Sequence, residues 1–146
     1  MIQLLNHREP DMANAIHQLS LNAYRVEADF LGVDLFPPLN EKIASILNSH
    51  SQFYGCYMDS LLAGVMELEG DVEKSVNRLV VDPLFFRRGI ATRLLDAGKA
   101  MGKTLRVSTA KANTPAVRLY QQSGFRLIDT FLIDDAIHIV VFECRP

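Results

Sequence analysis

Cysteine is scarce in this sequence, which has only Cys56 and Cys144 among its 146 residues. Both lie in apolar, strand-like contexts, so we expect two reduced, packed thiols rather than a disulfide or a nucleophile. Histidine and cysteine nowhere cluster with the spacing of metal ligands. The sequence therefore predicts neither a disulfide scaffold nor a metal site.

Long apolar runs and an excess of charge are missing as well. No run approaches the ~20 apolar residues that cross a membrane as a helix, and the first residues lack the charged region of a signal peptide. The formal net charge is −2, which gives no field that would attract nucleic acid or an anionic membrane. We expect a soluble, cytoplasmic protein with no nucleic-acid partner and no membrane partner.

The sequence does contain enough apolar material for one globular domain. Hydrophobic residues make up 49% of the chain, and a chain of this length can bury a substantial core. No internal repeat, low-complexity segment or linker divides it. We therefore expect a single domain over residues 1–146.

The most informative stretch leads from a strand into a helix. Leu79, Val80 and Val81 form an apolar run before Pro83, which is typical of the end of a buried strand. The pattern then changes to helical spacing, with apolar residues at Phe86, Ile90, Leu94, Ala97 and Met101. A strand, a short loop and an amphipathic helix are predicted here.

Two arginines stand where this helix is expected to begin. Arg87 and Arg88 place positive charge beside the positive end of the helix dipole, where acidic residues are preferred by up to ~1 kcal/mol, so we expect an anionic partner. Gly89 lets the backbone approach a ligand, and the free N–H groups of the first turn can hold a phosphate. The pattern indicates a pyrophosphate site; the alternative is an amphipathic helix with solvated arginines.

Two motifs together resemble the GCN5-related N-acetyltransferase (GNAT) family. The run Arg87-Arg88-Gly89-Ile90-Ala91, after Val81-Asp82-Pro83, is similar to the acyl-CoA pyrophosphate loop Q/R-x-x-G-x-G/A, with Phe86 in place of Gln or Arg. Residues 113–125 fit the family's N-x-x-A-x-x-L-Y-x-x-x-G-F segment at every defined position. Such loops bind phosphate mostly through backbone N–H groups. Phe86 therefore weakens the match to the sequence motif more than it weakens the capacity of the loop to bind phosphate.

The order of the predicted elements agrees with that family. We expect strands at residues 2–7, 52–58, 61–69, 76–81, 105–109, 125–133 and 136–144. We expect helices at residues 10–24, 40–47 and 86–101, and a last one that Thr114 caps and that ends at Gly124. The resemblance implies an α/β (α+β) fold, a GNAT-type mixed, mostly antiparallel central sheet of about six to seven strands. Helices would cover both faces, and strands 76–81 and 105–109 would be parallel and splayed around the acyl-CoA arm.

The resemblance also implies the roles of individual residues. The backbone of Leu79, Val80 and Val81 would bind pantetheine and stabilise the oxyanion, and Tyr120 matches the family's general acid. An unperturbed phenol with a pKa of about 10 lies within two units of a thiol at about 8.5, so it can protonate the departing thiolate. The residues expected to bind the cofactor are Leu79, Val80, Val81, Arg87, Arg88, Gly89, Ile90, Ala91, Thr92, Asn113 and Tyr120.

The sequence does not identify the general base that would deprotonate the amine. Glu67 and Glu69 share a strand face by alternation and are the best candidates, the alternative being a solvated or ion-paired role. His138 can titrate in the right range, the alternative being a structural role. A water chain can replace all three.

One segment has the composition of an acceptor site. In the resembling family, the segment between the first two helices lines the acceptor side of the cleft, and here it combines aromatic rings with carboxylates, which suit an ammonium. The alternative is an ordinary surface loop with a few packed rings. The residues in question are Tyr24, Glu27, Asp29, Phe30, Asp34 and Phe36.

The resemblance implies an acetyl-CoA-dependent N-acetyltransferase that moves an acetyl group to a primary amine by direct attack in a ternary complex, with acetyl-CoA as co-substrate. The alternative, from another class, is a non-catalytic acyl-CoA-binding or regulatory module. The lack of an obvious base favours this alternative, whereas the intact Tyr120 segment argues against it. The sequence leaves open which small-molecule or peptide amine is the acceptor. The family also suggests a homodimer that pairs through the last strands.

Overall fold

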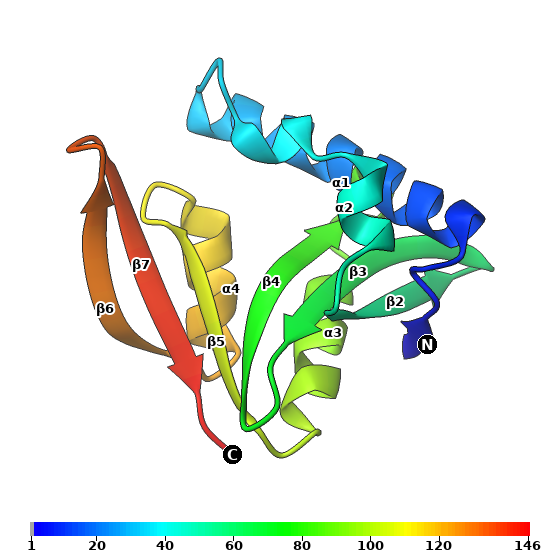
Figure 1. The fold of residues 1–146 in the computed structure, drawn as a ribbon. Helices are drawn as coiled ribbons and strands as arrows, with labels where there is room; N and C mark the ends of the chain where they lie inside the picture. The colour runs from blue at the N-terminus through cyan, green and yellow to red at the C-terminus, as the bar shows by residue number, and fades with distance from the viewer. Residues whose placement is uncertain (1) are drawn as a thin grey trace.

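Seven strands form one mixed sheet in the order β1-β2-β3-β4-β5-β7-β6 (Figure 1). The computed structural model describes residues 2–146. Neighbouring strands are antiparallel except for β4 and β5, which are parallel. This confirms the predicted fold class. The strands are β1 (Ile2–Leu5), β2 (Gln52–Met58), β3 (Leu61–Glu69), β4 (Glu73–Val81), β5 (Thr104–Ala110), β6 (Arg126–Ile133) and β7 (Ile137–Cys144).

The parallel pair β4 and β5 opens into a splay. Their register covers only Glu73–Ser75 against Thr104–Arg106, after which the two strands diverge, as Figure 1 shows. Beyond Ser75, β4 pairs only with β3, and beyond Arg106, β5 pairs only with β7. The end of β4, including Leu79 and Val81, therefore presents backbone groups to the gap without a neighbouring strand on that side.

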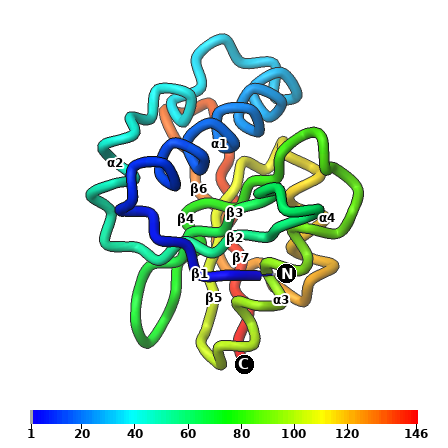
Figure 2. The backbone as a smooth tube through the Cα atoms, turned by 90° about the vertical axis from the view of Figure 1, so that its right-hand side faces the viewer, coloured from blue at the N-terminus to red at the C-terminus, as the bar shows by residue number. Residues whose placement is uncertain are grey.

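Helices cover both faces of the sheet. On one face, α1 (Pro10–Leu31) and α2 (Ile43–Leu47) pack on β1 to β4 (Figure 2). On the other face, α3 (Ile90–Lys99) and α4 (Thr114–Gln122) enclose a second core. Short 3-10 helices lie at Pro37–Asn40 and Pro83–Phe85. Within residues 2–146, no helix is both long and apolar enough to span a membrane.

Several predicted helix boundaries are wrong, and α2 begins at Ile43 rather than at residue 40. Helix α1 continues to Leu31, where Gly32 ends it at φ 67° and donates to the carbonyls of Ala28 and Asp29. Helix α3 begins at Ile90 rather than at residue 86, because the chain before it forms a 3-10 turn and an extended residue. Asn113, not Thr114, caps α4: its Oδ1 accepts from Ala116 N at 3.3 Å.

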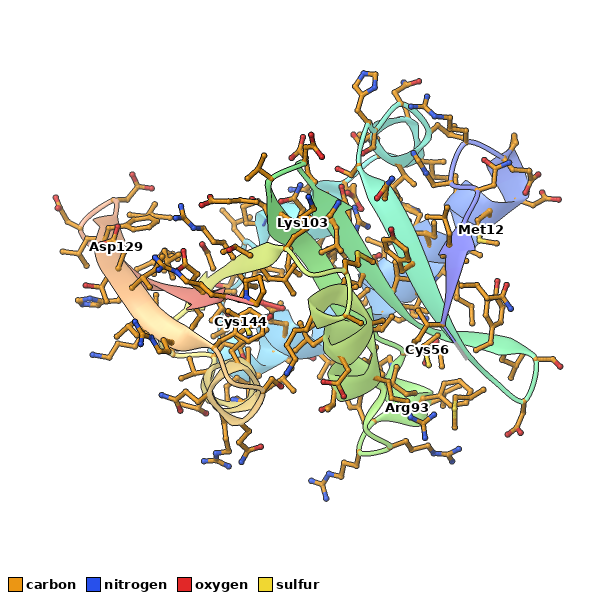
Figure 3. The ribbon with its side chains drawn as sticks, turned by 90° about the horizontal axis from the view of Figure 1, so that it is seen from below. Met12, Cys56, Arg93, Lys103, Asp129 and Cys144 are labelled. Atoms are coloured by element: carbon orange, nitrogen blue, oxygen red, sulfur yellow. The ribbon has the colours of Figure 1, made fainter. Side chains whose placement is uncertain are left out.

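Two short hairpin turns join neighbouring strands, and the two cysteines lie on strands far apart in the sequence. Asp59 and Ser60 join β2 to β3 with φ values of 51° and 68°, and Asp134 and Asp135 turn between β6 and β7 with 51° and 57°. These positive values match the short hairpin turns that favour such residues. Both cysteines are free, and they lie on different strands, β2 and β7 (Figure 3).

The contact between β3 and the start of α3 leaves no room for a side chain at Gly64. A Cβ there would lie 2.6 Å from Ile90 Cγ2 and 3.3 Å from the Val80 carbonyl oxygen. We therefore expect Gly64→Ala to lower the free energy of unfolding by about 1–3 kcal/mol, measured by urea unfolding with circular dichroism.

Gly98→Ala in the middle of α3 is the matched control. Its Cβ would meet the flexible ends of Leu105 and Met66 at 3.2 and 3.4 Å, and alanine favours the helix over glycine by about 0.8–1.0 kcal/mol. This variant should stay close to the wild type in stability. Equal stability of the two variants would contradict the packing argument.

Candidate active site

The loop before α3 is shaped to hold an anion. Gly89 is the N-cap residue of α3 in the left-handed region and caps it without a side chain, so the N–H groups of the first turn have no side-chain cap. A Cβ at Gly89 would meet no atom of residues 2–146 within 4 Å, and the first turn of α3 borders a cavity through Gly89, Ile90, Ala91 and Thr92. Arg87 also has a positive φ, 64°, an uncommon conformation for a residue with a side chain. This open end of α3 fits the pyrophosphate that the sequence predicts.

A cavity of about 540 Å³ extends from this loop along the end of β4. It is closed by α1 on one side and by the beginning of α4 on the other. Arg88 does not line it; its guanidinium lies 5.5 Å from the centroid of the Phe85 ring. The predicted cofactor residues that line it are Leu79, Val80, Val81, Arg87, Gly89, Ile90, Ala91, Thr92 and Asn113.

A second cavity of about 300 Å³ adjoins the first in the gap between β4 and β5. Its walls include Tyr24 and Phe36 from the predicted acceptor segment, Ser108 from β5 and Tyr120 from α4. The residues common to both cavities are Glu27, Leu79, Val80, Ala91, Asn113, Ala116 and Leu119. The predicted cofactor residues and part of the predicted acceptor segment therefore meet at one place.

Tyr120 brings a hydroxyl to the smaller cavity from a buried position. Its ring packs against Phe125 and Phe142, with centroids 5.7 and 5.9 Å away, and its hydroxyl hydrogen-bonds to none of residues 2–146. Burial raises the pKa of Tyr120, and the nearby carboxylate of Glu27 raises it further. The expectation of an unperturbed phenol is therefore wrong: the hydroxyl is a weaker acid that stays protonated as a donor at neutral pH.

Asn113 caps α4 and also lines both cavities. Its Oδ1 caps α4 through Ala116 N, while its Nδ2 hydrogen-bonds to no residue that the structure describes. Since Asn113 lines both cavities, the capping bond fixes the side chain and leaves the amide nitrogen free to donate to a ligand.

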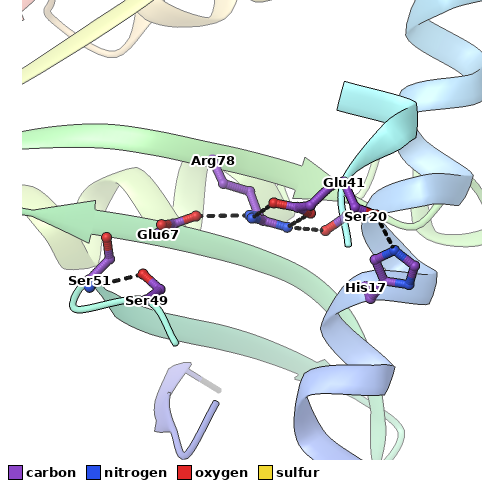
Figure 4. A network of polar contacts seen from close by, with 7 residues as sticks. All are labelled: His17, Ser20, Glu41, Ser49, Ser51, Glu67 and Arg78. Carbon is purple, nitrogen blue, oxygen red and sulfur yellow. Dashed lines mark hydrogen bonds and ion pairs between the residues drawn. The ribbon is translucent and has the colours of Figure 1, made fainter. Parts of the chain in front are cut away.

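The predicted bases lie elsewhere. Glu67 is buried and accepts from Arg78 Nε at 3.0 Å (Figure 4), so the ion-paired alternative is confirmed for it. Glu69 accepts from Asn77 Nδ2 at 2.9 Å, and His138 is exposed on β7. Glu67, Glu69 and His138 do not line either cavity, so the geometry does not support a catalytic role for them.

Arg78 is the centre of a buried polar network (Figure 4). In addition to Glu67, its guanidinium donates to Glu41 Oε1 at 2.8 Å and to Ser20 Oγ at 2.9 Å. It also lies 5.4 Å from the centroid of the Phe53 ring. These contacts join β4, β3, α1 and the segment before α2 into one unit behind the smaller cavity.

Sequence reasoning missed Glu27 as a candidate base. Glu27 was expected in a loop, but it lies on α1, where Ala23, Val26, Glu27 and Phe30 share the face that lines the larger cavity. Their spacing of three and four residues is helical. Gly32 was the signal for the later end of this helix, since glycine commonly ends helices in the left-handed conformation.

The acetyltransferase (GNAT) domain model matches residues 35–145 of this chain. The chain belongs to this family. It is 36% identical over 151 residues to UPF0157 protein YqkA of Bacillus subtilis (strain 168). The match covers 100% of this chain and 44% of that protein. This GNAT chain thus spans less than half the length of that relative.

Solved structures confirm the GNAT fold. The ribosomal-protein-S18-alanine N-acetyltransferase of Escherichia coli is 16% identical with a TM-score of 0.72, covering 98% of this chain and 91% of that one. The PaiA N-acetyltransferase of Thermoplasma acidophilum, in complex with coenzyme A, is 20% identical with a TM-score of 0.69, covering 97% and 98%. Aminoglycoside 6'-acetyltransferase type Ii is 13% identical with a TM-score of 0.75, covering 99% and 96%. At these identities the likeness shows the fold alone.

The Arg78 network should be structural rather than catalytic. Arg78→Met leaves Glu67 and Glu41 without their cation, and breaking a buried pair in this way costs about 3–5 kcal/mol of unfolding free energy. Urea unfolding followed by circular dichroism measures the loss. Glu69→Gln, which alters an exposed contact, is the control and should change stability by less than about 0.5 kcal/mol. A loss under about 1 kcal/mol for Arg78→Met would refute this role.

Proposed function

We propose that this GNAT protein transfers an acetyl group from acetyl-CoA to a primary amine by direct attack in a ternary complex. One observation carries the proposal: the loop before α3, the end of β4 and Tyr120 border two adjoining cavities in the β4–β5 gap. Two structures of similar fold support the donor, since one is in complex with coenzyme A and another has acetyl-CoA bound.

The larger cavity fits the donor. The N-terminal residues of α3 border this cavity. A pyrophosphate is favoured there by the helix dipole, and Arg87 adds a positive charge on the wall. The free backbone side of Leu79–Val81 can pair with the extended pantetheine arm as an additional strand would. Its N–H groups are then the donors for the oxyanion of the tetrahedral intermediate.

The smaller cavity fits the acceptor and the leaving group. Tyr24 and Phe36 supply aromatic walls, with ring centroids 6.2 Å apart, which suit the alkyl part and the cationic head of an amine. Tyr120 faces the same space with a free hydroxyl and donates to the sulfur as the thiolate departs. The acceptor is therefore a small-molecule or peptide amine.

A non-catalytic acyl-CoA-binding module is the second candidate function. It is favoured by the positions of Glu67, Glu69 and His138, which do not line either cavity. Such a module would bind acetyl-CoA without transferring its acetyl group to any amine. The Tyr120 variant below separates the two functions.

Acetyl-CoA should stabilise the protein through the loop at Gly89. At 100 times its dissociation constant, the ligand adds ~2.7 kcal/mol and raises the unfolding midpoint by roughly 5–10 °C. Gly89→Asp should abolish this shift, because a carboxylate would then occupy the space for the pyrophosphate. Differential scanning calorimetry with and without acetyl-CoA measures it.

Gly89→Asn is the control for shape, because asparagine has the same size without the charge and tolerates a positive φ. It should keep most of the shift. If Asp and Asn behave alike, the charge at this position does not matter. If the wild type itself shows no shift, the donor site is wrong.

Tyr120→Phe should slow chemistry without weakening donor binding. Loss of a general acid typically lowers kcat by about 10²–10⁴-fold. Stability should stay within ~0.5 kcal/mol, because the Tyr120 hydroxyl has no partner in the part of the chain that the structure describes. Release of free thiol during steady-state turnover gives kcat and KM. Tyr54→Phe, which removes a hydroxyl bonded to Gln52 outside both cavities, is the control. Unchanged kcat in Tyr120→Phe would exclude the acid role.

A further inference from the structure

Glu27 occupies the junction of the two cavities. Among residues 2–146 that line them, Glu27 is the one carboxylate, and it borders both. The other charged lining residues are Arg87 in the larger cavity and Arg78 in the smaller. Glu27 is therefore the acidic group placed where the donor site and the acceptor site meet.

The carboxylate of Glu27 has no partner among residues 2–146. It is half-buried and makes no hydrogen bond or ion pair with the residues that the structure describes. Tyr24 on the same helix and Tyr120 from α4 lie near it, and the charged residues that line the cavities with it are Arg78 from β4 and Arg87 from the loop. Arg78 is already neutralised by Glu67 and Glu41. Glu27 is thus free to meet a ligand.

We infer that Glu27 is the catalytic base of the reaction: its carboxylate binds the ammonium of a primary alkylamine acceptor and removes a proton from it. This inference rests on the proposed function, to which it adds the missing base and the charge class of the acceptor. A lysine-like ammonium is only about 0.1% neutral at pH 7, so the reaction needs such a group.

Glu27 and Tyr120 together account for every proton that moves in the reaction. The ammonium gives one proton to Glu27, which passes it to water, and the neutral nitrogen attacks the thioester carbonyl carbon. The carbonyl electron pair moves to oxygen and returns as the C–S bond breaks. The sulfur takes a proton from Tyr120, which regains one from the acetylated nitrogen. Acetyl-CoA and an ammonium thus yield an amide, free CoA and one released proton.

The surroundings of Glu27 suit this role. Burial raises the pKa of Glu27 above its ordinary value, and a carboxylate with a raised pKa is a stronger base. Tyr24 cannot replace it, because burial raises the pKa of Tyr24 to about 12 and its phenol stays protonated. Asp29, on the same helix, is exposed and lines neither cavity.

The experiment compares Glu27→Gln with the control Asp29→Asn on two kinds of acceptor. The first kind is a panel of primary alkylamines that includes spermidine, ethanolamine and Nα-acetyl-lysine. The second is hydroxylamine, which is already neutral near pH 7.5 and needs no deprotonation before attack. Free thiol release gives kcat and KM, and calorimetry with acetyl-CoA gives donor binding. Glu27→Gln should lose roughly 100-fold or more in kcat/KM with alkylamines but stay within about threefold with hydroxylamine.

Stability provides a readout that is independent of turnover. Because the pKa of Glu27 is raised in the folded state, its ionised form costs stability, and that cost is absent at low pH and grows as pH rises through the unfolded-state value. Glu27→Gln should therefore match the wild type near pH 4 and have the higher unfolding midpoint near pH 8. A variant less stable at both pH values would overturn the inference in favour of a structural role.

The outcomes separate this inference from the proposed function. Equal losses with alkylamines and hydroxylamine, or no loss with either, overturn the role of Glu27 while leaving the acetyltransferase in place. A wild type that acetylates hydroxylamine but none of the alkylamines also overturns the role of Glu27, because a working base would allow protonated amines to be acetylated. A wild type that binds acetyl-CoA but acetylates neither acceptor overturns the proposed function itself and this role with it.

Discussion

The short parallel pairing between β4 and β5 is the constraint on which the site depends. Backbone hydrogen bonds normally satisfy both sides of a central strand, yet the β4–β5 register stops at Ser75 and Arg106. The chain stays folded around the gap because α4 encloses a core with Tyr120 and Phe142 on the far side. Under the proposed function the unpaired edge of β4 is the binding surface, since its backbone groups need a partner that a ligand can supply.

A second constraint holds α1 over that gap. Arg78 extends from β4 to Glu67 on β3, and it also contacts Ser20 on α1 and Glu41 in the following segment. A buried guanidinium that satisfies several partners at once fixes their relative positions. Because Ser20 and Glu27 belong to one helix, the network also determines where Glu27 lies relative to β4. A polar cluster that takes no part in the proposed chemistry thereby positions the group that does.

The sequence predicts the fold and the donor half of the site better than the acceptor half. The bounds of β2 and β3 follow from alternation and the Asp59-Ser60 turn, and the loop around Gly89 follows from a local motif. The role of Glu67 could not be read in this way, because it depends on Arg78 and on Glu41, which lies 37 residues from Arg78 along the chain. The position of Glu27 is predicted wrongly for a local reason: the sequence pattern places the end of α1 near Tyr24, whereas the helix continues to Leu31, before Gly32.

The two helix ends at the gap have opposite polarity, which suits the two differently charged substrates of the proposed function. The N-terminus of α3 carries partial positive charge and adjoins Arg87, so it favours the anionic donor. The C-terminal turns of α1 carry partial negative charge together with Glu27, and the last turn has no basic residue to neutralise it. The helix dipole therefore favours a cation at the C-terminal end of α1. An ammonium that binds at Glu27 compensates the carboxylate for the hydration that it loses by burial. Glu27 then deprotonates the ammonium, which produces the nucleophile at the junction with the donor site.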